Sequence, residues 1–163
     1  MPTQQPEIVT QPADQTVPVG GAATFSVAAF GSLPLSYSWM RNGVPIAGAS
    51  SSSYTTNHVP SAGSGSLFSC LVTNAFGSVT SQVATLTVLD PAIIGQPVSQ
   101  DKNLGESVTF SVTAVGTPPL SYQWWKGGAA LAQATGASLT LASLQASDAG
   151  APTGWWSAAR PGA

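Results

Sequence analysis

The chain has 163 residues, of which only 6% are charged, and its formal net charge is −2. This balance offers no basic surface for nucleic acid and no polybasic face for an anionic membrane, so we exclude nucleic acid as a partner. No apolar run approaches the roughly 18 residues that span a bilayer, so we also expect no membrane insertion. The hydrophobic fraction of 43% is typical of a folded chain.

The sequence contains an internal repeat that defines its domains. After an N-terminal segment, residues 1–5, the stretch 6–43 aligns without a gap with 91–128, at an offset of 91 − 6 = 85. A repeat of this kind predicts two copies of one domain, residues 6–89 and 90–163, with almost no linker between them. The start of the chain lacks a basic stretch followed by an apolar one, so it is no signal peptide. If the protein is exported, we expect this chain to be a fragment of something longer, or its start to have been assigned internally.

Each copy reads as short strands separated by Gly, Pro and Ser. In the first copy "ATFSVAAF" alternates, which places Phe25 and Val27 on one face, and "LSYSWMR" places Tyr37 and Trp39 on one face. "SLFSCLVTN", a turn at "AFGS" and "VTSQVATLTVL" then read as a hairpin of two longer strands. No segment shows helical periodicity. The pattern predicts an all-β protein, a sandwich or a barrel.

The residues of the first copy resemble a known family. "GGAATFSV" at 20–27, Trp39 in "YSW" followed by "RNG", and "LFSCLVTNAFGSVTS" look like an I-set immunoglobulin-like domain, as found in tandem arrays on large bacterial surface and secreted proteins. The resemblance implies two tandem immunoglobulin-like β-sandwiches, the second truncated before strands F and G. It also implies an extracellular or cell-surface location and a protein or cell-surface partner, with a glycan as the alternative ligand.

The same resemblance assigns the core. In this family a buried Trp on strand C packs against a disulfide between strands B and F, and a Tyr precedes the second Cys by two residues. Trp39 and Trp124 match the Trp, and Cys70 matches the second Cys, but Val27 and Val112 stand at its partner position, so the disulfide cannot form. The expected structural core is Val27, Trp39, Phe68, Cys70, Val112 and Trp124.

Catalytic and metal-binding chemistry finds little support in the sequence. A Cys70 nucleophile would need a nearby base, and His58 is the one histidine of the chain. Asp90 and Asp101 could share a calcium site, but the acidic residues are scattered singly, and two solvated carboxylates are the simpler interpretation. We therefore expect no catalytic residue, no metal site and no cofactor.

One aromatic residue is a candidate ligand contact. Trp125 should point outward by strand alternation if Trp124 points inward, and an exposed Trp can stack on a sugar or anchor a protein. Tyr37 or Tyr54 would complete such a site. The alternative is that Trp125 covers the sheet face or the adjacent domain.

The C-terminal stretch departs from the repeat. After "SDAG" the resemblance implies a strand F that reads roughly Tyr-x-Val-Val-Val, whereas the chain reads "APTGWWSAARPGA". Back-translation of this stretch permits a shifted frame, and one consistent reading of that frame is "AYRVVVSGAA", a strand F of this family. We therefore infer that the coding frame slipped near Gly150 and that 151–163 is a frame-shifted tail. A genuine, divergent C-terminus is the alternative.

These observations favour a non-catalytic structural or adhesion module, a spacer or protein-binding array of an exported bacterial protein. The alternative is a carbohydrate-binding module accessory to a secreted enzyme, and a hydrolase is a more distant third. The fold by itself does not choose among them, because this sandwich hosts many functions.

Overall fold

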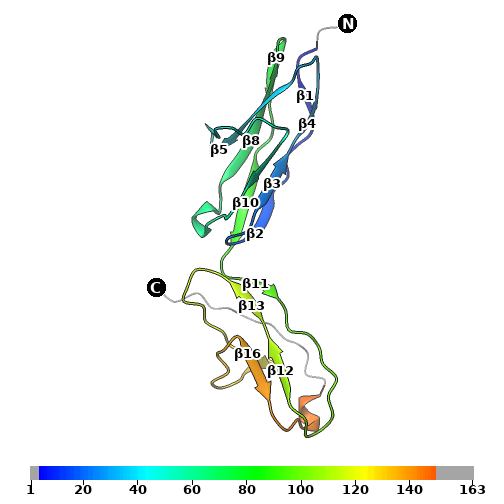
Figure 1. The fold of residues 1–163 in the computed structure, drawn as a ribbon, viewed down its shortest axis with the longest axis vertical. Coiled ribbons are helices and arrows are strands. Elements are labelled where there is room, and N and C mark those ends of the chain that lie inside the picture. Colours follow the sequence, from blue (N-terminus) through cyan, green and yellow to red (C-terminus); the bar gives the residue numbers. More distant parts are fainter. Residues whose placement is uncertain (1–3, 150–163) are drawn as a thin grey trace. The chain divides into compact units, whose positions relative to one another are not determined.

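The computed structural model describes residues 4–149. The chain divides into two compact units, residues 1–89 and 90–163, which we call unit 1 and unit 2. Within the described residues the secondary structure is almost all strand, and the only helical elements are two short 3-10 turns (Figure 1). No helix in this part of the chain is long and apolar enough to span a bilayer.

Unit 1 contains one large sheet and two strand pairs. The large sheet has the order β2-β10-β8-β5-β6, with β9 also paired to β8, and the pairs are β1-β4 and β3-β7. The bounds of its elements are β1 Glu7–Thr10, β2 Gln15–Pro18, β3 Ala23–Ser26, β4 Ala28–Phe30, β5 Ser36–Arg41, β6 Val44–Pro45, β7 Ser53–Thr56, η1 Ser61–Gly63, β8 Leu67–Asn74, β9 Gly77–Thr80 and β10 Ala84–Leu89.

Alternation along the strands builds the core of unit 1. Phe25 and Val27 are buried, whereas Thr24 and Ser26 between and before them are exposed. The same rule buries every second residue of β8 and β10, because successive side chains of a strand point to opposite faces. The inner faces of the two layers thus meet in one apolar cluster that includes Trp39.

The stretch "VTSQVATLTVL", which the sequence predicts as one strand, is divided between two strands, β9 and β10. β9 pairs with β8 in a hairpin, whereas β10 pairs with the start of β8 and, in parallel, with β2. The break falls at Ser81, whose hydroxyl accepts the Cys70 backbone N–H at 2.9 Å. This side-chain bond interrupts the regular ladder, and the chain then turns toward β2.

Unit 2 repeats the elements of unit 1 at the offset of 85 residues. β3 begins at 23 and β12 at 108, β7 at 53 and β16 at 138, and η1 at 61 and η2 at 146. The pairs are β11-β13, β12-β16 and β14-β15. The bounds are β11 Ala92–Gly95, β12 Val108–Ser111, β13 Thr113–Val115, β14 Trp125–Lys126, β15 Ala129–Ala130, β16 Ser138–Leu141 and η2 Ala146–Asp148.

Two strands of unit 1 have a reduced counterpart in unit 2. β5 has six residues, all paired with β8, whereas β14 has two residues, which pair with β15. Residues 100–103, the counterpart of β2, form no strand in the described structure. The counterpart of β8 would be residues 152–159, which lie outside the described part of the chain.

Candidate functional site

The expected core residues of unit 1 lie together in its interior. Trp39 and Cys70 are fully buried and are register partners across β5 and β8, and Val27 is 5% exposed in the same cluster. The Trp39 indole N–H donates to the Ser51 carbonyl oxygen at 2.9 Å. A buried Trp needs such an acceptor, because an unpaired N–H in the core costs free energy.

Phe68 is the centre of an aromatic stack. Its ring lies 4.3 Å from that of Phe25 and 6.0 Å from that of Tyr54, measured between centroids. Tyr54 and Tyr37 are both half-buried against the core of unit 1. Both tyrosines therefore serve packing in unit 1, whereas Trp125 belongs to unit 2.

Cys70 has the environment of a structural thiol. Its sulfur donates to the Leu71 carbonyl oxygen at 3.7 Å, and burial raises the pKa of the thiol above its ordinary value. A raised pKa disfavours the thiolate, which is the nucleophilic form. His58 lies in the exposed loop after β7, with a left-handed φ of 50°. The Cys70 hydrogen bonds that involve a side chain join it to Leu71 and Ser81 instead of His58.

The core of unit 2 follows the same plan around Trp124. This residue is 1% exposed, and its indole N–H donates to the Gly136 carbonyl oxygen at 2.8 Å. Val112, the counterpart of Val27, is half-buried, as is Phe110, the counterpart of Phe25. Unit 2 thus keeps Trp124 buried, whereas Phe110 and Val112 are more exposed to solvent than their counterparts in unit 1.

Trp125 and its neighbour Lys126 have different surroundings. Trp125 is 39% exposed, so its ring is accessible, whereas Trp124 beside it is buried. Lys126 forms a salt bridge with Asp148 of η2. This contact, together with the backbone N–H of Gln145, lowers the pKa of the Asp148 carboxyl.

The two carboxylates considered for calcium have separate roles. Asp90 accepts hydrogen bonds from the Thr117 backbone N–H at 2.8 Å and from its hydroxyl at 2.6 Å, which fixes the loop after β13. Asp101 lies on the rim of a pocket in unit 2. Residues 4–149 contain no group of three or more His, Cys, Asp or Glu that could hold a metal ion.

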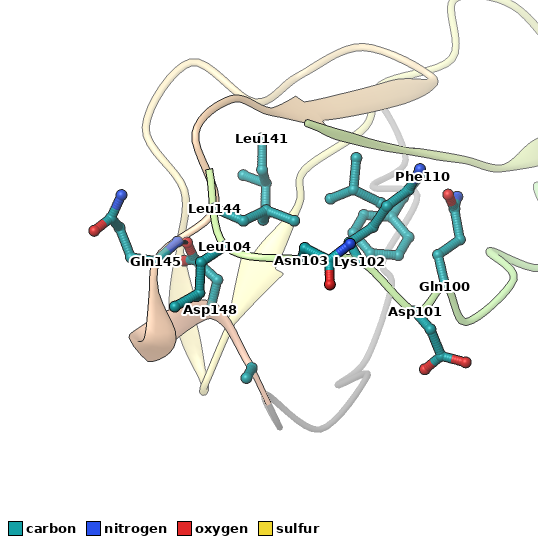
Figure 2. A pocket seen from close by; sticks show the side chains of 12 residues that line it. Gln100, Asp101, Lys102, Asn103, Leu104, Phe110, Leu141, Leu144, Gln145 and Asp148 are labelled. Carbon is teal, nitrogen blue, oxygen red and sulfur yellow. Dashed lines mark hydrogen bonds between the residues drawn. The ribbon is translucent and has the colours of Figure 1, made fainter. Parts of the chain in front are cut away.

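That pocket is the feature that sequence reasoning missed. It has a volume of about 300 Å³, and side chains from β12, from β16 and from the segments beside them converge on it (Figure 2). Phe110, Leu141 and Leu144 form its apolar floor, and Gln100 and Asp101 lie on its polar rim. The repeat offset could have located it, because two of the floor residues, Phe110 and Leu144, correspond to the core residues Phe25 and Val59 of unit 1.

Comparisons with known proteins agree with this architecture. The family model described as "Immunoglobulin domain" matches residues 90–151. Among curated relatives, tyrosine-protein phosphatase Lar of Drosophila melanogaster is 30% identical over 74% of this chain and 7% of its own length. Kin of IRRE-like protein 2 of Homo sapiens is 29% identical over 89% of this chain and 20% of its own length. Endoglucanase C of Cellulomonas fimi is 31% identical over 76% of this chain and 12% of its own length. The chain thus spans a fifth or less of these relatives.

Solved structures agree on the fold. An I-band fragment of titin superposes with a TM-score of 0.50 at 17% identity, covering 88% of this chain and 57% of the titin fragment. The immunoglobulin domains 1–5 of Sidekick-1 superpose with a TM-score of 0.50 at 20% identity, covering 91% of this chain and 33% of theirs. The chain therefore has an all-β immunoglobulin-like fold, and the sequence of its second unit is similar to the immunoglobulin domain model over residues 90–151.

Proposed function

We propose that this chain is a non-catalytic structural or adhesion module, a spacer or protein-binding array of an exported bacterial protein. The observation that carries this proposal is the direct succession of two similar units: β10 ends at Leu89 and β11 begins at Ala92. Repeated domains that follow one another without a long linker are typical of spacers and binding arrays. The bacterial and exported context rests on the sequence resemblance to tandem domains of surface and secreted proteins.

The chemistry of the candidate residues supports a non-catalytic role. The Cys70 thiol is buried and its pKa is raised, which opposes nucleophilic attack. The Asp90 carboxylate holds a loop, and the Asp148 carboxylate holds Lys126. Each of these groups is committed to a structural contact.

The strand order of unit 1 supports a role as a spacer under tension. β2, near the start of the unit, and β10, at its end, run parallel and pair over four residues each. The Val19 N–H extends this contact to the Leu89 carbonyl oxygen at 3.0 Å. When the two ends of the unit are pulled apart, the bonds between these strands are loaded together in shear.

Single-molecule force spectroscopy of the full chain tests this proposal. We expect unit 1 to unfold in one event, with a length gain near that of roughly 80 residues at about 3.5 Å each, and to refold on relaxation. Val19→Pro removes one N–H donor and should lower the rupture force, whereas the matched Val19→Ala keeps it. Rupture of unit 1 in several weak steps would contradict the spacer role.

A carbohydrate-binding module accessory to a secreted enzyme is the second candidate. The accessible ring of Trp125 supports it, since aromatic faces stack on sugars. The likeness to endoglucanase C supports the context of an enzyme. A glycan ligand should quench Trp125 fluorescence, and Trp125→Ala should abolish that change while Met40→Ala, at the counterpart position, leaves it intact. The absence of any change across a broad polysaccharide panel would remove this candidate.

A further inference from the structure

Arg41, the last residue of β5, has a guanidinium group that is held in one orientation. Its Nε and Nη2 atoms donate to the Ser66 hydroxyl oxygen at 3.1 Å and 2.8 Å, and Ser66 is only 5% exposed. Both bonds use the same edge of the planar group, so the other edge, formed by Nη1 and Nη2, faces away from this hydroxyl. Arg41 is exposed to solvent, and a guanidinium that is already fixed loses less entropy when it binds an acceptor.

Unit 2 shows what the equivalent cation binds. Lys126 is the counterpart of Arg41 at the offset of 85, and its ammonium forms a salt bridge with Asp148 of η2. The counterpart of Asp148 is Gly63, so unit 1 has no carboxylate at this position. A Cβ atom at Gly63 would lie 2.9 Å from a Val59 methyl group, so the position does not accept a side chain without a shift of its neighbour. Unit 1 therefore does not form the ion pair of unit 2.

The other acidic groups of unit 1 do not take this role. They are Glu7, which lies on β1, and Asp14, which accepts a backbone N–H of β10. Within residues 4–149 the side-chain hydrogen bonds of the guanidinium go to Ser66 alone. Arg41 is also the only Lys or Arg of unit 1. Its second edge has the geometry for a bidentate carboxylate, which forms shorter and stronger hydrogen bonds than a neutral acceptor.

An apolar side chain lies beside Arg41. Val44 of β6 is the register partner of Arg41, and partners across antiparallel strands have their side chains on the same face. Val44 is 66% exposed, and the smaller Ala129 stands at its counterpart position in unit 2. A fixed guanidinium next to an exposed aliphatic side chain is a favourable anchor for a protein partner, because Arg is enriched among the residues that dominate interface energies.

We propose that Arg41 and Val44 form a binding site for an acidic segment of a protein partner. An Asp or Glu carboxylate of the partner accepts hydrogen bonds from Nη1 and Nη2, and a neighbouring apolar side chain of the partner covers Val44. A polypeptide is the favoured ligand, because the equivalent cation of unit 2 binds the side chain of an Asp. This inference rests on the proposed protein-binding role and deepens it by naming the chemistry of the partner.

The probe is the peptide Val-Glu-Val-Glu-Val with acetylated and amidated ends, added to the full chain. NMR measures the chemical shifts of the Arg41 side-chain N–H groups and of the Val44 methyl groups. We expect saturable shifts at both residues, and the affinity should fall as the salt concentration rises, because the attraction is between exposed charges. The peptide Val-Gln-Val-Gln-Val is the matched control and should leave Arg41 unshifted.

Substitutions assign the binding energy to the two residues. Arg41→Gln should weaken binding about tenfold, because it removes the charge-assisted hydrogen bonds. Lys102→Gln removes the same charge from unit 2 and is the control, which should leave the affinity unchanged. Val44→Ala should weaken binding about threefold, because it removes part of the apolar contact.

A further variant separates a fixed guanidinium from a mere positive charge. Ser66→Ala keeps the charge of Arg41 but removes the hydroxyl that orients its guanidinium, so the affinity should fall severalfold. Charge alone would leave the affinity of this variant unchanged. Unaltered amide exchange at Trp39 and Cys70 verifies that unit 1 of each variant is folded.

Three outcomes would overturn the proposal. The first is no response of Arg41 and Val44 to the glutamate peptide, and the second is equal binding of that peptide by Arg41→Gln. The third is a stronger response of Arg41 to alginate, a polymer of uronic acids, at the same carboxylate concentration, which would identify an acidic glycan as the ligand. The force measurement on unit 1 needs no ligand, so failure of this inference and failure of the proposed spacer role are distinguishable.

Discussion

Trp39 and Trp124 make the same hydrogen bond in the two units. Each indole N–H donates to a backbone carbonyl 12 residues further along, that of Ser51 at 2.9 Å and that of Gly136 at 2.8 Å. Each backbone N–H also donates to a carbonyl ten residues ahead, at Ala49 and Ala134. Trp39 thus ties β5 to the segment that leads into β7, and Trp124, just before β14, ties its segment to the one that leads into β16.

Truncation of Trp39 should strongly destabilise unit 1. Trp39→Ala removes a fully buried ring and its hydrogen bond, and we expect a loss of about 3 to 5 kcal/mol in the free energy of unfolding. Equilibrium denaturation measures this loss. Trp125→Ala, at an exposed position, is the control and should cost about 1 kcal/mol or less. A loss below about 1 kcal/mol for Trp39→Ala would remove Trp39 from the core.

The Cys70 thiol should be protected until unit 1 unfolds. A thiol reagent should modify it far more slowly in buffer than in denaturant, because its sulfur is buried and its pKa is raised. A raised pKa in the folded state also means that stability is complete below the unfolded pKa of about 8.5 and falls as pH rises above it.

Cys70→Val tests this pH dependence. The variant should cost less than about 1.5 kcal/mol at pH 7, since valine has a similar volume, and it should lose less stability than the parent between pH 8 and 10. Equal reaction rates of the native and denatured parent with the thiol reagent would contradict the packing of Cys70.

Much of the strand pattern follows from the sequence alone. Alternation in "ATFSV" identifies the buried side of Phe25, and the 85-residue offset locates every element of unit 2 from β11 to η2. The immunoglobulin-like fold inferred from these motifs is confirmed by the structure and by its structural relatives. Local periodicity suffices here because each strand has one face in the core.

Other features could not be predicted locally. The break at Ser81 depends on a hydroxyl that bonds the Cys70 N–H on a neighbouring strand, and "VTSQVATLTVL" alone reads as one strand. The pocket beside Phe110 depends on which strands cover it. Both the strand break and the pocket depend on contacts between residues that are far apart in the sequence.

Acid should weaken unit 2 through Asp148. The Lys126 ammonium, and next the Gln145 N–H, lower the pKa of this carboxyl. A lowered pKa means that the contribution to stability is present above the unfolded pKa of about 4 and is lost as pH falls below it. Unit 1 has Gly63 at the counterpart position, and its Arg41 donates to Ser66 instead, so unit 1 lacks this dependence.

Amide exchange of Asp148→Asn measures the acid effect. Unit 2 of the variant should exchange faster than the parent at pH 7, and the difference in protection, corrected for intrinsic rates, should shrink as the pH falls from 7 to 3. Asp101→Asn, on the rim of the pocket, is the control and should not reproduce this behaviour. A difference that persists unchanged at pH 3 would assign the effect to packing instead of charge.

The two units should differ in stability across the full chain. We expect slow amide exchange in residues 22–88, where β8 and β10 cover the core, and fast exchange across much of 108–163. The expected frame-shifted tail, 151–163, lies outside the described residues, so this expectation rests on the open face beside Phe110 and on the two-residue length of β14. Uncovered strands exchange quickly because few buried contacts oppose their opening.

Restoration of the shifted frame tests whether the loss of strands F and G causes the fast amide exchange expected in unit 2. A chain that continues after Gly150 with "AYRVVVSGAA" and the residues of that frame should protect unit 2 to a degree similar to unit 1, because a strand F could then pair with residues 121–126 and place alternate valines over Phe110. A chain of equal length with serine at those valines is the matched control and should remain unprotected. If the present chain already shows equal protection in both units, the frame-slip interpretation has no physical consequence, and residues 151–163 are a working part of the domain.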